Sequence, residues 1–223
     1  MVVISFYKMI RNSLLKNASL AALSAVGLSL SFAGTAQALS FNEMGNAGEL
    51  LDTAQVIGGG EPLTEINGST SFGANDFADL FQFKTTGGFF SATTEGGDTD
   101  FDTALFLFDK TGDVVLSNDD IDFDNFVVES EISGDLAAGI YYLGITGAGY
   151  LPTDGLGSII NDPIDPPFGF DTFGTLGGWQ DEPFETGSYT VSLEGAEAVI
   201  PTPAAVLPVL SGLFAAARRN KNN

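Results

Sequence analysis

Between residues 39 and 197, the apolar residues fall into short runs, mostly of four to seven residues, which are separated by Gly, Asp, Asn and Pro. Most runs are rich in β-branched and aromatic residues, a composition that is typical of β-strands. No stretch between Phe41 and Glu197 keeps a 3.6-residue period over three turns, although residues 45–54 could form one helical turn. The pattern predicts an all-β fold, an antiparallel and jelly-roll-like β-sandwich in a single domain. The predicted strands include residues 80–83, 89–92, 104–108, 114–116, 140–145 and 189–193.

The first 38 residues have the three-part form of a secretory signal peptide. Lys8, Arg11 and Lys16 form a basic head, and residues 18–33 are apolar and uncharged. The Ala-Gln-Ala sequence at 36–38 then matches the small-x-small pattern that signal peptidase recognises. The alternative is a membrane anchor, but this weakly apolar stretch is short for a span of about 20 residues. We expect residues 1–38 to be removed on export, leaving a domain at 39–197 and a tail at 198–223.

The tail carries a second membrane-directed segment. Its apolar part, residues 205–217, is interrupted by Pro208 and is shorter than a bilayer span. The order of a short Pro-containing motif, an apolar segment and a basic cluster resembles the PEP-CTERM class of sorting signals, in the variant known as PTPA-CTERM. The residues that carry this resemblance are Pro201, Thr202, Pro203, Ala204, Arg218 and Arg219.

The resemblance implies that an exosortase-type membrane transpeptidase removes the tail. The protein would then reach the outer surface or extracellular matrix of Gram-negative-type cells, after a transient anchorage in the inner membrane. The short apolar segment, and Thr-Pro-Ala in place of Glu-Pro, depart from the class pattern and leave the processing enzyme open. A plain C-terminal anchor is the alternative interpretation.

The segment between the two ends is strongly acidic. All 29 Asp and Glu residues lie between Glu43 and Glu197, where Lys84 and Lys110 are the only basic residues, so this segment has a net charge of −27. A field of this sign excludes nucleic acid and anionic lipid as partners and attracts cations.

The composition also argues against catalysis. The chain has no His and no Cys, which excludes a Ser-His-Asp triad, a His-ligated zinc and a thiol nucleophile. Ser-Lys chemistry would have to use Lys84 or Lys110, and Lys110 lies in a predicted hairpin turn. A glycoside-hydrolysis mechanism with paired carboxylates remains open, but the acids occur mainly in turns, where exposure to solvent is the ordinary explanation for their presence. The sequence therefore predicts a protein that is not an enzyme.

Several ordered blocks resemble the bacterial pre-peptidase C-terminal (PPC) domain. They read FDTALFLFD at 101–109, SNDD at 117–120, LAAGIYYL at 136–143 and TGSYTV at 186–191, within a match of about residues 76–195. The resemblance implies a compact β-sandwich that accompanies secreted hydrolases and has no hydrolytic activity itself. Free-standing PPC-like proteins with PEP-CTERM tails have the same organisation. The segment 147–186 departs from the family because it is much longer than the usual connection.

Two acidic clusters predict a cation site. Residues 98–102 precede one predicted strand and residues 118–125 follow the next, so a hairpin with its turn at 110–113 would bring both clusters to its open end. Neighbouring carboxylates repel one another, and oxygen ligands select Ca²⁺ over transition metals. The predicted Ca²⁺ ligands are Asp100, Asp102, Asp119, Asp120, Asp122 and Asp124.

The spacing of residues 120–131 matches the ligand positions of an EF-hand loop, except that Asn125 replaces the Gly at the sixth position. Strand-like runs flank this loop instead of helices, which argues against a true EF-hand. A Ca²⁺ site at the edge of a sandwich is one interpretation, and a solvated acidic turn is the other.

Aromatic residues in the long segment offer a second candidate site. Phe168, Phe170, Phe173 and Trp179 could form a platform for polysaccharide, or they could pack the segment onto the sandwich. Two functions follow from these patterns. One is a structural or binding module of the cell surface or extracellular matrix that contacts polysaccharide and is stabilised by Ca²⁺. The other is an accessory domain for a separate secreted hydrolase.

Overall fold

The computed structural model describes residues 37–160 and 174–200, where it contains strands and two short 3-10 helices but no α-helix. Most of the predicted signal peptide and of the predicted sorting tail, and Phe168, Phe170 and Phe173, lie outside these ranges. No helix in the described ranges is long and apolar enough to cross a membrane. The strands are β1 (Leu39–Asn42), β2 (Gln55–Val56), β3 (Pro62–Ser69), β4 (Ala78–Thr85), β5 (Gly88–Thr93), β6 (Thr103–Asp109), β7 (Val114–Asn118), β8 (Glu131–Leu136), β9 (Gly139–Gly147), β10 (Leu151–Thr153), β11 (Gly178–Gln180) and β12 (Ser188–Glu197), and the 3-10 helices are η1 (Phe72–Ala74) and η2 (Phe123–Asn125).

Each predicted strand is present, which confirms the all-β fold class. The predicted hairpin also forms, because β6 pairs with β7 and the amide of Gly112, at a φ of 93°, donates to the carbonyl of Asp109. Residues 45–54 do not form a helix; the amide of Thr53 donates to the carbonyl of Leu50 in a single turn.

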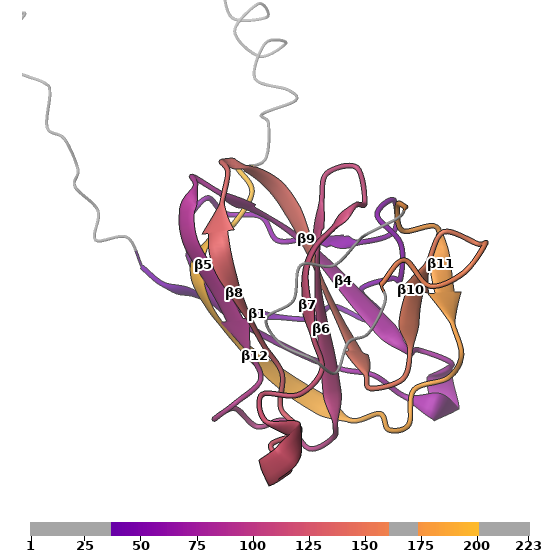
Figure 1. Ribbon diagram of the computed structural model, residues 1–223. Coiled ribbons are helices and arrows are strands. Elements are labelled where there is room, and N and C mark those ends of the chain that lie inside the picture. Colours follow the sequence, from indigo (N-terminus) through magenta and orange to yellow (C-terminus); the bar gives the residue numbers. More distant parts are fainter. Residues whose placement is uncertain (1–36, 161–173, 201–223) are drawn as a thin grey trace, which may run out of the picture. The chain divides into compact units, whose positions relative to one another are not determined.

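The main sheet has the order β1-β3-β12-β4-β9-β6-β7, and β5 joins β8 to β12. Nearly all pairs are antiparallel, but the short strands β1 and β2 pair parallel with β3 and β4. Figure 1 shows β5, β8 and β12 on one side of β4, β6, β7 and β9. Side chains from both groups share one buried core, which identifies a β-sandwich; they include Phe90, Ile132 and Leu193 from the first group and Phe81, Phe83, Leu105, Leu107 and Leu143 from the second.

Strand β6 is buried on both faces. Leu105 and Leu107 belong to the main core, while Phe106 and Phe108 belong to a second core on the opposite face. This second core is covered by part of the long segment, in which β10 and β11 form an antiparallel ribbon.

Trp179 of β11 fastens this ribbon to the sheet. Its ring stacks on Tyr150 at 5.4 Å and meets the rings of Phe106 and Phe108 edge-on. Its Nε1 donates to the carbonyl of Glu49 at 2.7 Å. Trp179 therefore packs the segment onto the sandwich, as one of the two interpretations expects, and the polysaccharide platform stays a prediction.

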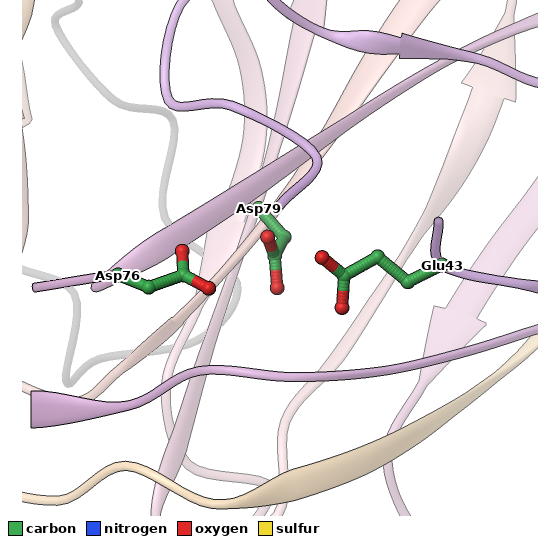
Figure 2. A group of neighbouring side chains, drawn as sticks. All are labelled: Glu43, Asp76 and Asp79. Atoms are coloured by element: carbon green, nitrogen blue, oxygen red, sulfur yellow. The ribbon is translucent and has the colours of Figure 1, made fainter. Parts of the chain in front are cut away.

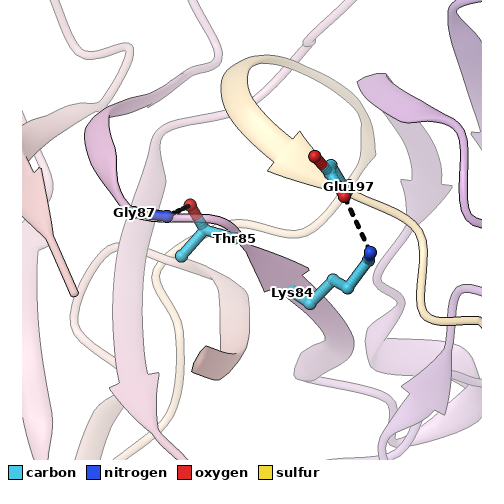
Figure 3. A network of polar contacts seen from close by, with 4 residues as sticks. All are labelled: Lys84, Thr85, Gly87 and Glu197. Atoms are coloured by element: carbon cyan, nitrogen blue, oxygen red, sulfur yellow. Dashed lines mark hydrogen bonds and ion pairs between the residues drawn. The ribbon is translucent and has the colours of Figure 1, made fainter. Parts of the chain in front are cut away.

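The last strand links the two layers. Strand β12 pairs with β3 from Ser188 to Ser192 and again at Ala196 and Glu197, and its residues 192–194 pair with β5. At its end, Lys84 Nζ lies 2.7 Å from Glu197 Oε2, while nearby the amide of Gly87 donates to Thr85 Oγ1 (Figure 3). This half-exposed ion pair is the only one that the structure shows between two residues of the described ranges.

Candidate metal centre

Three carboxyl groups from different segments meet at one side of β4. The side chains of Glu43, Asp76 and Asp79 point toward one another, with one oxygen of each within 4.8 Å of the others (Figure 2). Asp79 has no exposed surface and Asp76 is 7% exposed, whereas Glu43 is half-buried. It is the only such group of three found in residues 37–160 and 174–200.

The backbone places each of these residues independently. Glu43 follows β1, and its amide donates to the carbonyl of Asn67, which continues the pairing of β1 with β3. Asp76 closes the loop after η1 through two backbone hydrogen bonds with Ser71. Asp79 lies in β4, two residues before Phe81, so the alternation of the strand turns it toward the interior.

Only some of the oxygens of the three carboxyl groups accept hydrogen bonds from the protein. Asp79 accepts from the hydroxyl of Tyr189 at 2.7 Å and from the amide of Ala47 at 3.3 Å. Glu43 Oε2 accepts from the amide of Ser69 at 3.1 Å. Glu43 Oε1 and Asp76 Oδ1 are buried and have no hydrogen-bond partner. A buried acceptor without a partner is costly, and a cation would satisfy both oxygens at once.

Burial and mutual repulsion change the acidity of the group. Burial is the main cause that raises the pKa of Asp79 to about 8 and that of Asp76 to about 6, and the charge of Glu43 raises both further. Burial also raises the pKa of Glu43, against hydrogen bonds that lower it. Without a cation, Asp79 therefore keeps at neutral pH a proton that an ordinary carboxyl group has lost.

Gly68 leaves the space in which the centre forms. It lies opposite Tyr189 in the pairing of β3 with β12, and a Cβ at this position would contact the Tyr189 hydroxyl and lie 2.9 Å from Glu43 Oε2. We expect Gly68→Ala to lower the free energy of unfolding by about 1–2 kcal/mol, because the buried side chains around it must shift. It should also weaken cation binding at the centre.

Urea unfolding with Ca²⁺ and with EDTA measures both effects of Gly68→Ala. The matched control is Gly134→Ala in β8, where the added Cβ would make ordinary contacts at 3.6 Å. Equal stability losses in the two variants, with unchanged cation binding, would show that Gly68 has no special role at the centre.

The predicted Ca²⁺ ligands lie elsewhere, around the open end of the β6–β7 hairpin, and the structure brings only some of them together. Asp100 accepts from the amide of Ser188 at 2.8 Å. Asp122 accepts from the amide of Asn125 and from its side-chain amide, and Asp124 is exposed on η2. Asp102, Asp119 and Asp120 lie close to the strand ends, and Asp119 and Asp120 are buried. Ca²⁺ binding by these residues stays a prediction.

The loop at 120–131 does not have the backbone of an EF-hand. Its flanks are the strands β7 and β8, as the sequence indicated. The residue with a left-handed backbone is Phe126, at a φ of 59°, and not Asn125 at the sixth position.

Comparison with known proteins adds one structural similarity. No family model matches the chain, and no curated protein matches it in sequence. The chain is similar to the solved pre-peptidase C-terminal domain of the collagenase from Bacillus anthracis, with 13% sequence identity and a TM-score of 0.35. The match covers 63% of this chain and 93% of that domain.

Proposed function

We propose that this protein is an exported, non-catalytic β-sandwich module of the cell surface or extracellular matrix, stabilised by Ca²⁺ at the Glu43–Asp76–Asp79 centre. The observation that supports cation binding is a pair of buried oxygens without hydrogen-bond partners, one on Glu43 and one on Asp76. Both lie beside the carboxyl group of Asp79. Three carboxylates can offer up to about six oxygens, and Ca²⁺ takes 6–8 oxygen ligands. Transition metals favour nitrogen and sulfur donors, and the chain has neither His nor Cys.

The same geometry supports a binding role over catalysis. Asp79 has the most altered acidity of the three, yet it has no exposed surface and cannot contact a substrate. Of the two lysines in the acidic segment, Lys84 pairs with Glu197 and Lys110 lies in the exposed hairpin turn. Neutral polysaccharide is the proposed class of partner, because aromatic residues of the long segment can stack on sugar faces and the acidic surface repels polyanions.

Export is tested by mass spectrometry of the extracellular fraction of the native cells. The mature protein should begin near Leu39 and lack most of the chain after about residue 200, because both ends have the pattern of removable signals. A species in the medium that retains Arg218 and Arg219 would contradict the sorting role of the tail. Recovery of the whole chain in the inner membrane would contradict export to the surface.

A further inference from the structure

The structure brings a second set of acids, of which Asp120 is buried, together at the open end of the β6–β7 hairpin. Leu105 pairs with Asn118, so the chain entering β6 and the chain leaving β7 run side by side. The hydroxyl of Ser130 joins them, because it contacts the carbonyl oxygens of Thr103 at 2.6 Å and Asp119 at 2.9 Å. Asp102 and Asp120, the next residues along each chain, are thereby held near each other.

Asp120 is unusual for an acid at a strand end. Its side chain is 7% exposed, and its Oδ1 is buried without a hydrogen-bond partner. Asp102 Oδ1 is also buried and has no partner. Burial is the main cause that raises the pKa of Asp102 to about 6, and the charges of Asp120 and Glu185 raise it further.

Glu185 approaches this pair from the segment before β12. Its Oε2 accepts a hydrogen bond from the backbone amide of Asp102 at 3.2 Å, which holds the Glu185 carboxylate beside Asp102. Asp100 accepts from the amide of Ser188, Asp122 accepts from the backbone amide of Asn125, and Asp124 is exposed on η2.

We propose that Asp102 and Asp120, closed by Glu185, form a second divalent-cation site that is separate from the Glu43–Asp76–Asp79 centre. The ligand class is a hard cation such as Ca²⁺, because oxygen atoms are the donors. Binding there joins the β6–β7 end to the segment before β12. Glu185 is exposed, whereas all three acids of the first centre are buried or half-buried, so the affinity should be in the range of extracellular Ca²⁺ modules, about 10⁻⁴ to 10⁻³ M.

Equilibrium dialysis of the purified full chain against ⁴⁵Ca²⁺ measures the number of bound ions and tests this site. Ca²⁺ concentrations up to about 5 mM should saturate both sites, which gives about two bound ions per chain. The double variant Asp102→Asn with Asp120→Asn should bind about one ion fewer and keep the tighter site. Glu43→Gln with Asp76→Asn should lose the tighter ion and keep the weaker one. The control is Asp52→Asn with Asp135→Asn, two exposed acids outside both acidic clusters, which should bind as the native protein does.

The two proposals fail in different ways. Unchanged stoichiometry in the Asp102/Asp120 variant overturns the second site, whatever happens at the first centre. Loss of an ion from that variant alone, with no change in the Glu43/Asp76 variant, supports the second site and contradicts the first. The single variant Asp102→Asn distinguishes loss of the site from misfolding. Its circular dichroism spectrum should match that of the native protein, and its affinity for the weaker ion should be at least about 10-fold lower. An unchanged affinity for this ion would again overturn the second site.

Discussion

Ca²⁺ at about 1 mM should raise the melting temperature of the protein by about 5–11 °C above its value in EDTA. A centre of three carboxylates is expected to bind with a dissociation constant of about 10 µM, and linkage then gives about 2.7 kcal/mol of added stability. For a domain of this size, each kcal/mol corresponds to a shift of about 2–4 °C. Differential scanning calorimetry measures the shift.

The shift must be separated from screening of the acidic surface. Mg²⁺ and NaCl at matched ionic strength should give a smaller rise, because Mg²⁺ dehydrates reluctantly and demands a more regular geometry. The variant Glu43→Gln with Asp76→Asn should lose most of the Ca²⁺-specific shift, whereas the exposed pair Asp52→Asn with Asp135→Asn should keep it. Equal shifts with Ca²⁺ and Mg²⁺ would mean that the acids act only as a diffuse surface charge.

In EDTA, the stability of the protein should fall by about 3–5 kcal/mol between pH 4 and pH 8. The pKa of Asp79 is raised to about 8 in the folded chain, chiefly by burial, and that of Asp76 to about 6. Between the ordinary pKa of Asp, about 4, and these values, the folded protein binds more protons than the unfolded chain, so stability decreases as the pH rises. Each pKa unit corresponds to about 1.4 kcal/mol, and urea unfolding across the pH range gives the curve.

Asp79→Asn provides the control for this pH dependence. The amide cannot ionise and keeps an oxygen for the Tyr189 hydroxyl, so most of the slope between pH 6 and 8 should disappear. The exposed pair Asp52→Asn with Asp135→Asn should leave the slope in place. Ca²⁺ should also reduce the slope, because a cation favours the ionised carboxylates. A native stability that rises through this window would contradict the burial of an ionisable Asp79.

The strand pattern was predictable because apolar runs and turn residues are local signals. Strand β3 is harder to recognise, because its fully buried residues Leu63 and Ile66 stand singly among polar ones. The role of the long segment depends on partners distant in sequence. Trp179 packs on β6 and on Tyr150, and nothing local to Trp179 distinguishes a packed ring from a binding platform.

The first metal centre was not predicted, because its members come from three segments and form no local motif. The prediction favoured the densest acidic stretch, at 118–125, where several acids only cap turns or face solvent. One signal was present: Asp79 lies two and four residues before Phe81 and Phe83, so the alternation of the predicted strand already places an acid among core residues. Its partners, Glu43 and Asp76, required the tertiary structure.

The most direct test of the account is an anomalous difference map from crystals grown with about 5 mM CaCl₂. The account predicts a peak between the carboxyl groups of Glu43, Asp76 and Asp79, with Ca–O distances of about 2.3–2.6 Å to an oxygen of each. The Tyr189 hydroxyl should still donate to Asp79 in that structure. A map with no peak at this position, and with the three side chains unchanged, would contradict the proposal that the sandwich is a Ca²⁺-stabilised module.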